Sequence, residues 1–119
     1  METVLFVEDC EDIREIYEAI LTDEGYSVIK AENGREGLRL FHESEPELVL
    51  TDVMMPSSTG LDMIRLIRKK DKNVPIIAIS GDPEHGKLSC GVGANSFIEK
   101  PFSSAHLIKK VAGHLNGSG

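Results

Sequence analysis

The chain has 119 residues, of which 40% are hydrophobic and 28% charged, and its formal net charge is −7. This length and composition fit one globular domain and exclude disorder as the main description. The longest apolar runs, such as Val4–Val7 and Ile76–Ile79, fall far short of the roughly 18 to 20 residues that span a bilayer, and the acidic balance disfavours direct contact with nucleic acid.

Five short segments rich in β-branched residues and bounded by turn or charged residues are predicted as strands. In chain order they are Thr3–Val7, Ser27–Ala31, Leu48–Thr51, Ile76–Ser80 and Ser96–Glu99. Helical patterns follow each strand. In the first, the apolar residues from Ile13 to Leu21 recur with helical spacing, and Asn33 is a plausible N-cap of the second.

The third helix is marked by Leu61, Ile64 and Ile67, and the fifth follows a cap at Ser103 or Ser104. The fourth, Pro83–Val92, has the weakest pattern because it contains two glycines, each costing about 1 kcal/mol relative to alanine. It is therefore expected to be short and mobile.

Strands that alternate with helices predict an α/β fold of (βα)5 type. Because the strands are almost continuously apolar, helices should cover both faces of a parallel, five-stranded sheet, which makes a flavodoxin-like three-layer sandwich. In open parallel sheets, ligands bind beyond the carboxyl ends of the strands. These ends are therefore where chemistry is expected.

Polar residues follow four of the predicted strands. They are Glu8 and Asp9 after the first, Asp52 after the third, Ser80 at the end of the fourth and Lys100 after the fifth. Three carboxylates in one cleft repel one another unless a cation such as Mg2+ joins them, and Mg2+ prefers oxygen ligands and phosphate. The ammonium and the hydroxyl could bind phosphoryl oxygens. The set predicts a site for a metal and a phosphoryl group together.

Each residue alone has an ordinary structural interpretation. Glu8 and Asp9 could cap the helix that begins near Glu11, and an aspartate such as Asp52 at a strand end is often a turn residue. Ser80 before Gly81 could be turn chemistry, and a lysine is usually solvated. Only the joint placement favours a functional site.

In these motifs the chain resembles the receiver domains of two-component response regulators. The resemblance rests on four segments: Val4–Asp9, Leu50–Pro56 with Gly60, Ile77–Gly81 and Gly93–Phe102. It implies the strand order 2-1-3-4-5, a receiver domain over residues 1–116, and a flexible tail or linker over residues 117–119.

The resemblance also implies a role for each matching position. Asp52 would be the phosphoacceptor, and Lys100 and Ser80 would bind the phosphoryl group. Mg2+ would be held by Asp9 as the principal acidic ligand, by Asp52 and the backbone carbonyl of Met54, and by Glu8 acting through water. Ser80 and Phe97 would form the switch, with Phe97 acting through packing alone. Met54 and Asp82, each two residues beyond a site residue, would tune the phosphoryl lifetime. Ser58 and Thr59 depart from the family pattern.

The expected function is that of a cytoplasmic signalling domain, not an enzyme. A histidine kinase or histidine phosphotransfer protein would phosphorylate it, and the fourth helix, fifth strand and fifth helix would control an output domain or partner, with a homodimer through that face as one possible assembly. No binding to nucleic acid or membrane is expected.

Three alternative functions fit the sequence less well. A hydrolase would need a second acid where Met54 stands. A flavin or nucleotide module would need a phosphate loop where the acidic segment 8–12 lies. A degenerate receiver would act only as a protein-binding module, and the filled site positions argue against it.

Overall fold

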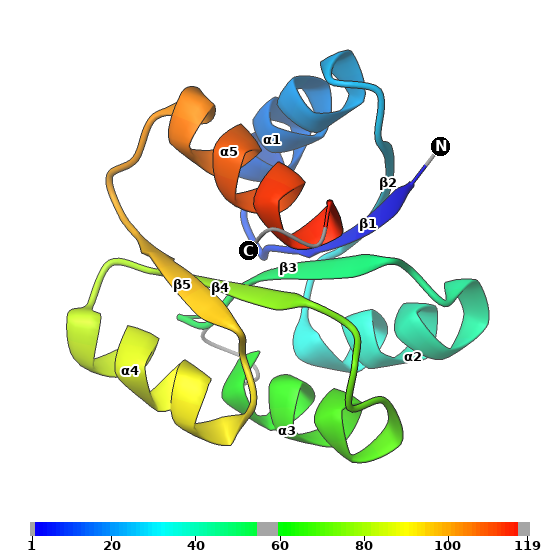
Figure 1. Ribbon diagram of the computed structural model, residues 1–119, viewed down its shortest axis with the longest axis vertical. Helices are drawn as coiled ribbons and strands as arrows, with labels where there is room; N and C mark the ends of the chain where they lie inside the picture. Colours follow the sequence, from blue (N-terminus) through cyan, green and yellow to red (C-terminus); the bar gives the residue numbers. More distant parts are fainter. Residues whose placement is uncertain (1, 55–59, 117–119) are drawn as a thin grey trace.

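The computed structural model describes residues 2–54 and 60–116. Five strands and five helices alternate along the chain (Figure 1). The strands are β1 (Thr3–Val7), β2 (Ser27–Ala31), β3 (Leu48–Asp52), β4 (Ile76–Ser80) and β5 (Ser96–Glu99). The helices are α1 (Glu11–Asp23), α2 (Gly34–Ser44), α3 (Gly60–Lys70), α4 (Pro83–Val92) and α5 (Ser104–Leu115).

All strand pairs are parallel, and their order is β2-β1-β3-β4-β5, which confirms the predicted α/β sandwich. The strand bounds match the prediction except that β3 extends one residue further, to Asp52, which pairs with Ile79. Asp52 is therefore the last residue of a central strand rather than a loop residue.

Two apolar clusters hold helices on opposite faces of the sheet, because side chains alternate between the faces along each strand. Val4 and Phe6 of β1 belong to the cluster that also contains Leu21 of α1 and Leu107 of α5. Alternate strand residues, including Leu5 and Val7, face the cluster that α2 and α3 complete, and α4 lies on this same side (Figure 1).

Helix ends are fixed largely by local side chains, as the sequence predicts. Asn33 caps α2 by accepting a hydrogen bond of 2.8 Å from the Glu36 N–H, and Ser103 caps α5 by accepting one of 3.1 Å from the His106 N–H. The N-cap of α1 is Cys10, which makes no side-chain capping bond. The N-cap position is therefore held by Cys10, and of the two predicted acids Glu8 bonds the helix start, accepting from the Cys10 N–H at 3.1 Å.

None of the helices in the described parts of the chain has the length and apolar character needed to cross a membrane.

Candidate functional site

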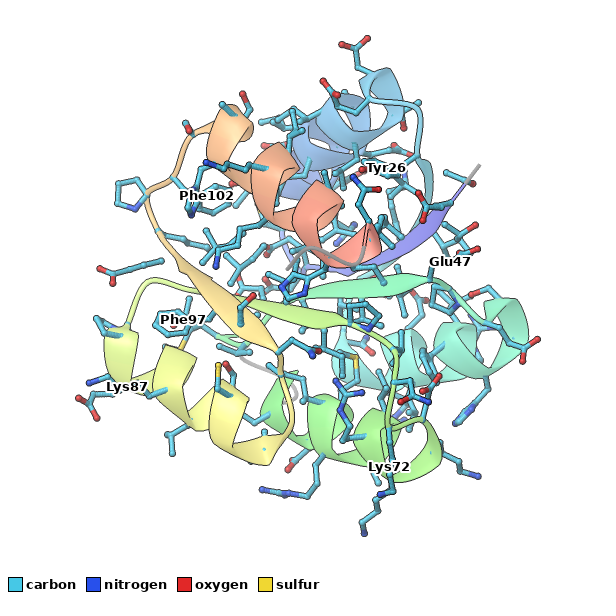
Figure 2. All side chains as sticks on the ribbon, in the orientation of Figure 1. Tyr26, Glu47, Lys72, Lys87, Phe97 and Phe102 are labelled. Atoms are coloured by element: carbon cyan, nitrogen blue, oxygen red, sulfur yellow. The ribbon has the colours of Figure 1, made fainter. Side chains whose placement is uncertain are left out.

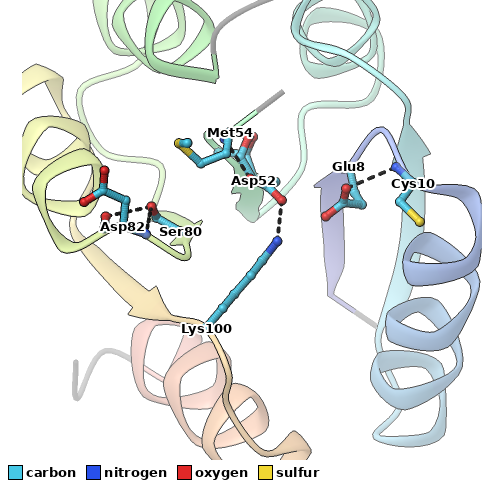
Figure 3. Close-up of polar contacts among 8 residues, drawn as sticks. Glu8, Cys10, Asp52, Met54, Ser80, Asp82 and Lys100 are labelled. Atoms are coloured by element: carbon cyan, nitrogen blue, oxygen red, sulfur yellow. Dashed lines mark hydrogen bonds and ion pairs between the residues drawn. The ribbon is translucent and has the colours of Figure 1, made fainter. Parts of the chain in front are cut away.

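The carboxyl ends of four strands place their polar side chains at one edge of the sheet (Figure 3). Asp52 ends β3 and Ser80 ends β4, while Glu8 and Lys100 directly follow β1 and β5. Backbone hydrogen bonds join these ends: Val53 N–H donates to the Ile79 carbonyl at 3.1 Å, and Lys100 N–H donates to the Ser80 carbonyl at 2.9 Å. The hydrogen bonding between the parallel strands thus continues into the residues of the site.

Asp52 is buried, with 2% of its surface exposed. Its Oδ1 accepts a hydrogen bond of 2.7 Å from the Met54 N–H, and its Oδ2 accepts one of 2.7 Å from Lys100 Nζ. Burial lowers the pKa of Lys100, but the hydrogen bond and charge of Asp52, with the charge of Glu8, outweigh burial and raise that pKa overall. Lys100 therefore stays cationic beside a fixed carboxylate.

Glu8 is buried to the same extent as Asp52 but is poorly partnered. Its Oε2 accepts a hydrogen bond of 3.1 Å from the Cys10 N–H, whereas its Oε1 has no hydrogen-bond partner among the described residues. Burial first, then Asp9 and Asp52, raise the pKa of Glu8 from 4.5 to about 8. A buried carboxyl with an unpartnered oxygen is what a nearby cation would stabilise.

Asp9, the other predicted metal ligand, is exposed at the surface. Within residues 2–54 and 60–116, no three His, Cys, Asp or Glu side chains form a cluster that could hold a metal ion. The structure thus brings Glu8 and Asp52 together at the strand ends, and the exposed Asp9 lies beside Glu8.

The Ser80 hydroxyl points to α4 rather than to Asp52. Ser80 Oγ donates to the Asp82 carbonyl at 2.8 Å and accepts from the Asp82 N–H at 3.0 Å. The carboxylate of Asp82 caps α4, accepting from the Glu84 N–H at 3.0 Å and lying 2.9 Å from His85 Nδ1. In Figure 3 this carboxylate lies on the far side of Ser80 from Asp52.

Phe97 and Met54 are the two apolar residues predicted for the site. The side chain of Met54 is exposed, at 47% of its surface. Phe97 lies between β5 and α4 (Figure 2), and a Cβ added at Gly86 of α4 would collide with its ring. Gly86 is therefore buried under the Phe97 ring, which leaves no room for a side chain at this position. Helix propensity alone does not reveal this packing role. Ser58 and Thr59 lie outside the described residues.

Two residues of α1 near the site were not singled out from the sequence. Arg14 Nη1 donates to the backbone carbonyl of Glu8 at 2.6 Å. Tyr17 has a pKa raised by burial and by the charges of Glu8 and Asp52, with Lys100 acting against them. Their spacing of three residues, which places both on one helix face, is the signal that could have found them.

The chain matches the family model described as "Response regulator receiver domain" over residues 4–112. Among curated relatives, it is 40% identical over 110 residues to the uncharacterized transcriptional regulatory protein YcbL of Bacillus subtilis, covering 90% of this chain and 48% of that protein. It is 37% identical over 118 residues to YkoG of the same organism, covering 98% and 52%. The chain thus spans about half the length of these relatives.

Solved structures give the same picture. The chemotaxis protein CheY4 of Vibrio cholerae is 32% identical, with a TM-score of 0.87 and coverage of 93% of this chain and 96% of that one. NtrX of Brucella abortus is 32% identical, with a TM-score of 0.92 and coverage of 98% of this chain but 27% of that one.

Proposed function

The chain belongs to the response regulator receiver domain family of two-component signalling, and we propose that Asp52 accepts a phosphoryl group from the phosphohistidine of a histidine kinase or histidine phosphotransfer protein. One arrangement carries the proposal. The buried carboxylate of Asp52 lies 2.7 Å from the Lys100 ammonium, at the strand end that matches the family's acceptor position.

The transfer forms a bond between an Asp52 carboxylate oxygen and phosphorus while the bond from phosphorus to the histidine nitrogen breaks. The electron pair of the broken bond stays on the imidazole, which takes up a proton. The Met54 N–H holds one carboxylate oxygen at 2.7 Å, which orients the nucleophile before the donor arrives. Lys100, 2.7 Å from Asp52 Oδ2, would stabilise the phosphoryl oxygens.

Glu8, Asp9, Asp52 and the backbone carbonyl of Met54 would hold Mg2+. The unpartnered Oε1 of Glu8 fits this role, because a cation would satisfy an oxygen that no described donor reaches. When bound, Mg2+ would neutralise charge on the carboxylates and on the phosphoryl oxygens. Asp9 is exposed and would complete the ligand set from the solvent side.

Phosphorylation would switch the face made by α4, β5 and α5. The phosphoryl group adds about −1.5 to −2 charges and needs hydrogen-bond donors. Ser80 would leave its two bonds to Asp82 and donate to a phosphoryl oxygen instead. Because Asp82 caps α4 and Phe97 rests on Gly86 of the same helix, that exchange would displace both α4 and Phe97.

The partners of the switch follow from the same family. We assign an output domain or a separate target protein to the α4-β5-α5 face, with a homodimer through that face as a possible assembly. The domain would act in the cytoplasm without binding nucleic acid itself, and it would assist its own phosphorylation and dephosphorylation without turning over a separate product.

The test is incubation with acetyl phosphate and Mg2+, followed by intact mass spectrometry. The chain should gain the mass of one phosphoryl group, and Asp52→Asn should not. Asp23→Asn, at the exposed end of α1, is the matched control and should be labelled like the unchanged chain.

Excess chelator should abolish the labelling. Undiminished labelling of Asp52→Asn would refute the acceptor assignment, and full labelling in chelator would refute the metal. A correctly folded chain that is never labelled would instead favour a degenerate receiver that only binds proteins.

A further inference from the structure

In the sequence of α1, Arg14 is the one basic residue beside five acidic ones. It nevertheless forms no ion pair with a carboxylate of the described residues. Its Nη1 donates instead to the backbone carbonyl of Glu8 at 2.6 Å, and its side chain is half-buried. An arginine that binds one backbone oxygen in preference to the carboxylates of its own helix points to a role in holding that backbone.

The backbone in question is the β1–α1 turn, residues 8–10, which joins the first strand to the first helix. Arg14 binds this turn twice. Its side chain donates to the Glu8 carbonyl, and its backbone N–H donates to the Cys10 carbonyl at 3.0 Å. Asp9 lies between these two residues in the chain, so Arg14 holds the carbonyls of both neighbours of Asp9.

The two acids of the turn differ in what fixes them. Glu8 is buried, its N–H donates to the Ala31 carbonyl at 3.0 Å, and its Oε2 accepts from the Cys10 N–H at 3.1 Å (Figure 3). Asp9 is exposed, so the direction of its side chain depends on its backbone. Because the peptide group is planar, the bond from Arg14 to the Glu8 carbonyl also fixes the plane that contains the Asp9 nitrogen.

We propose that Arg14 is a positioning residue for Mg2+ binding, which holds the β1–α1 turn so that Glu8 and Asp9 present their carboxylates in one arrangement. The proposal rests on the proposed function, because it takes these two acids as metal ligands. A hydrogen bond from a charged donor is stronger than one between neutral groups, which suits a restraint on a solvent-exposed turn. Groups that orient metal ligands typically contribute about 10- to 100-fold in metal affinity.

The charge of Arg14 and its hydrogen bond act on Mg2+ binding in opposite directions. A guanidinium near a metal site repels the metal ion, so removal of the charge alone would tighten Mg2+ binding. Removal of the hydrogen bond would loosen the β1–α1 turn and weaken Mg2+ binding. The sign of the change in affinity therefore distinguishes a positioning role from a purely electrostatic one.

The test is a titration of the unphosphorylated, 15N-labelled chain with Mg2+, followed through the amide shifts of residues 8–10 and 53–54. Arg14→Met, which keeps the apolar stem but loses the donor, should weaken Mg2+ binding by about tenfold. Arg14→Lys keeps the charge and an N–H donor and should stay within about threefold of the unchanged chain. Arg39→Met removes the same charge from an exposed ion pair on α2 and should change the affinity by less than about twofold.

A second measurement tests the turn without any metal. In chelator, the heteronuclear NOE of the Asp9 and Cys10 amides reports their motion on the picosecond to nanosecond timescale. It should fall in Arg14→Met and stay unchanged in Arg39→Met. Thermal unfolding should show all variants folded. Arg14→Gln, which is polar but uncharged, should weaken Mg2+ binding in the same direction and replaces the methionine variant if that variant does not fold.

Three results would overturn the positioning role while the metal site itself stands. They are unchanged or tighter Mg2+ binding by Arg14→Met, equal weakening by Arg14→Met and Arg39→Met, and an unchanged heteronuclear NOE in the turn. Absence of any saturable Mg2+-dependent shift in the unchanged chain would instead refute the metal assignment under the proposed function, and the role of Arg14 with it.

Discussion

At the amino edge of the sheet, the half-buried Arg68 has carbonyl or amide oxygen partners for all three of its nitrogens, whereas at the carboxyl edge the buried Glu8 has one oxygen with no partner among the described residues. Arg68 donates to the backbone carbonyls of Asp71, Val74 and Gly93 and to Asn95 Oδ1, at 2.9 to 3.0 Å. Glu8 is 2% exposed, and its Oε1 is unpartnered among the described residues.

This difference distinguishes polar groups that stabilise the fold from polar groups that are kept for function. A hydrogen-bond network with every group paired fixes the loops that it joins, whereas an unsatisfied buried group lowers stability and persists where function requires it. The amino edge is therefore the part of the sheet where polar groups stabilise the fold, and the carboxyl edge is the part where the proposed cation would bind.

The largest expected effect comes from removing the Arg68 hydrogen bonds at the amino edge. Arg68→Ala leaves the carbonyls of Val74 and Gly93 without their donor and should lower the free energy of unfolding by about 3 kcal/mol. Urea denaturation measures it. Arg65→Ala, one turn earlier on α3, removes only an exposed ion pair with Asp62 and should cost less than about 1 kcal/mol. Equal losses would contradict the assignment of Arg68 as the link between these loops.

The next prediction concerns the buried Glu8 at the carboxyl edge. In chelator, the native state should hold the Glu8 proton up to a pH of about 8, whereas the unfolded chain releases it near 4.5. The native state then binds more protons over this interval, so this group makes the free energy of unfolding fall as pH rises from about 5 to 8.

Glu8→Gln removes that dependence and should stabilise the chain at pH 8 by about 2 kcal/mol. Urea denaturation at pH 5 and pH 8 checks it, with the exposed Glu15→Gln as control. The prediction fails if Glu8→Gln and the unchanged chain lose stability in parallel as pH rises.

Helix α4 connects the two edges, because it begins beside Ser80 and ends near Arg68. Alanine substitutions at its two glycines distinguish the effect of side-chain packing on stability from the effect of helix propensity. Gly86→Ala places a methyl group against the Phe97 ring and should cost about 1 to 2 kcal/mol. Gly91→Ala meets nothing within 4 Å and should stabilise by about 0.5 to 1 kcal/mol. Thermal and urea unfolding of the two variants measure the change in the free energy of unfolding. A change of the same sign for both substitutions would disprove the packing of Phe97 against Gly86.

The smallest effect concerns the lifetime of the phosphoryl group at the carboxyl edge. Met54→Asn with Asp82→Ala should change the first-order rate of phosphoryl loss by about three- to fivefold, a barrier change of about 0.6 to 1 kcal/mol. Asp82 is engaged with Glu84 and His85, so Met54→Asn alone should reproduce most of the change by admitting water. Mass spectrometry over time gives the rate, and an unchanged rate in the double variant would count against both residues.

Residues close together in sequence determined the elements and the edge where the site lies. Apolar runs and their bounding residues predicted the strands, Asn33 and Ser103 predicted two helix starts, and the strand ends predicted Asp52, Ser80 and Lys100 as neighbours. These signals suffice because periodicity and capping act over a few residues, and because parallel strands bring their carboxyl ends to one edge.

Tertiary structure alone decided which groups are buried and which find partners. It buried Glu8 while leaving its neighbour Asp9 exposed, packed the Phe97 ring against Gly86, and joined Arg68 to Gly93 and Asn95, 25 and 27 residues away. No local pattern encodes these outcomes, because they depend on how separate helices cross the two faces of one sheet.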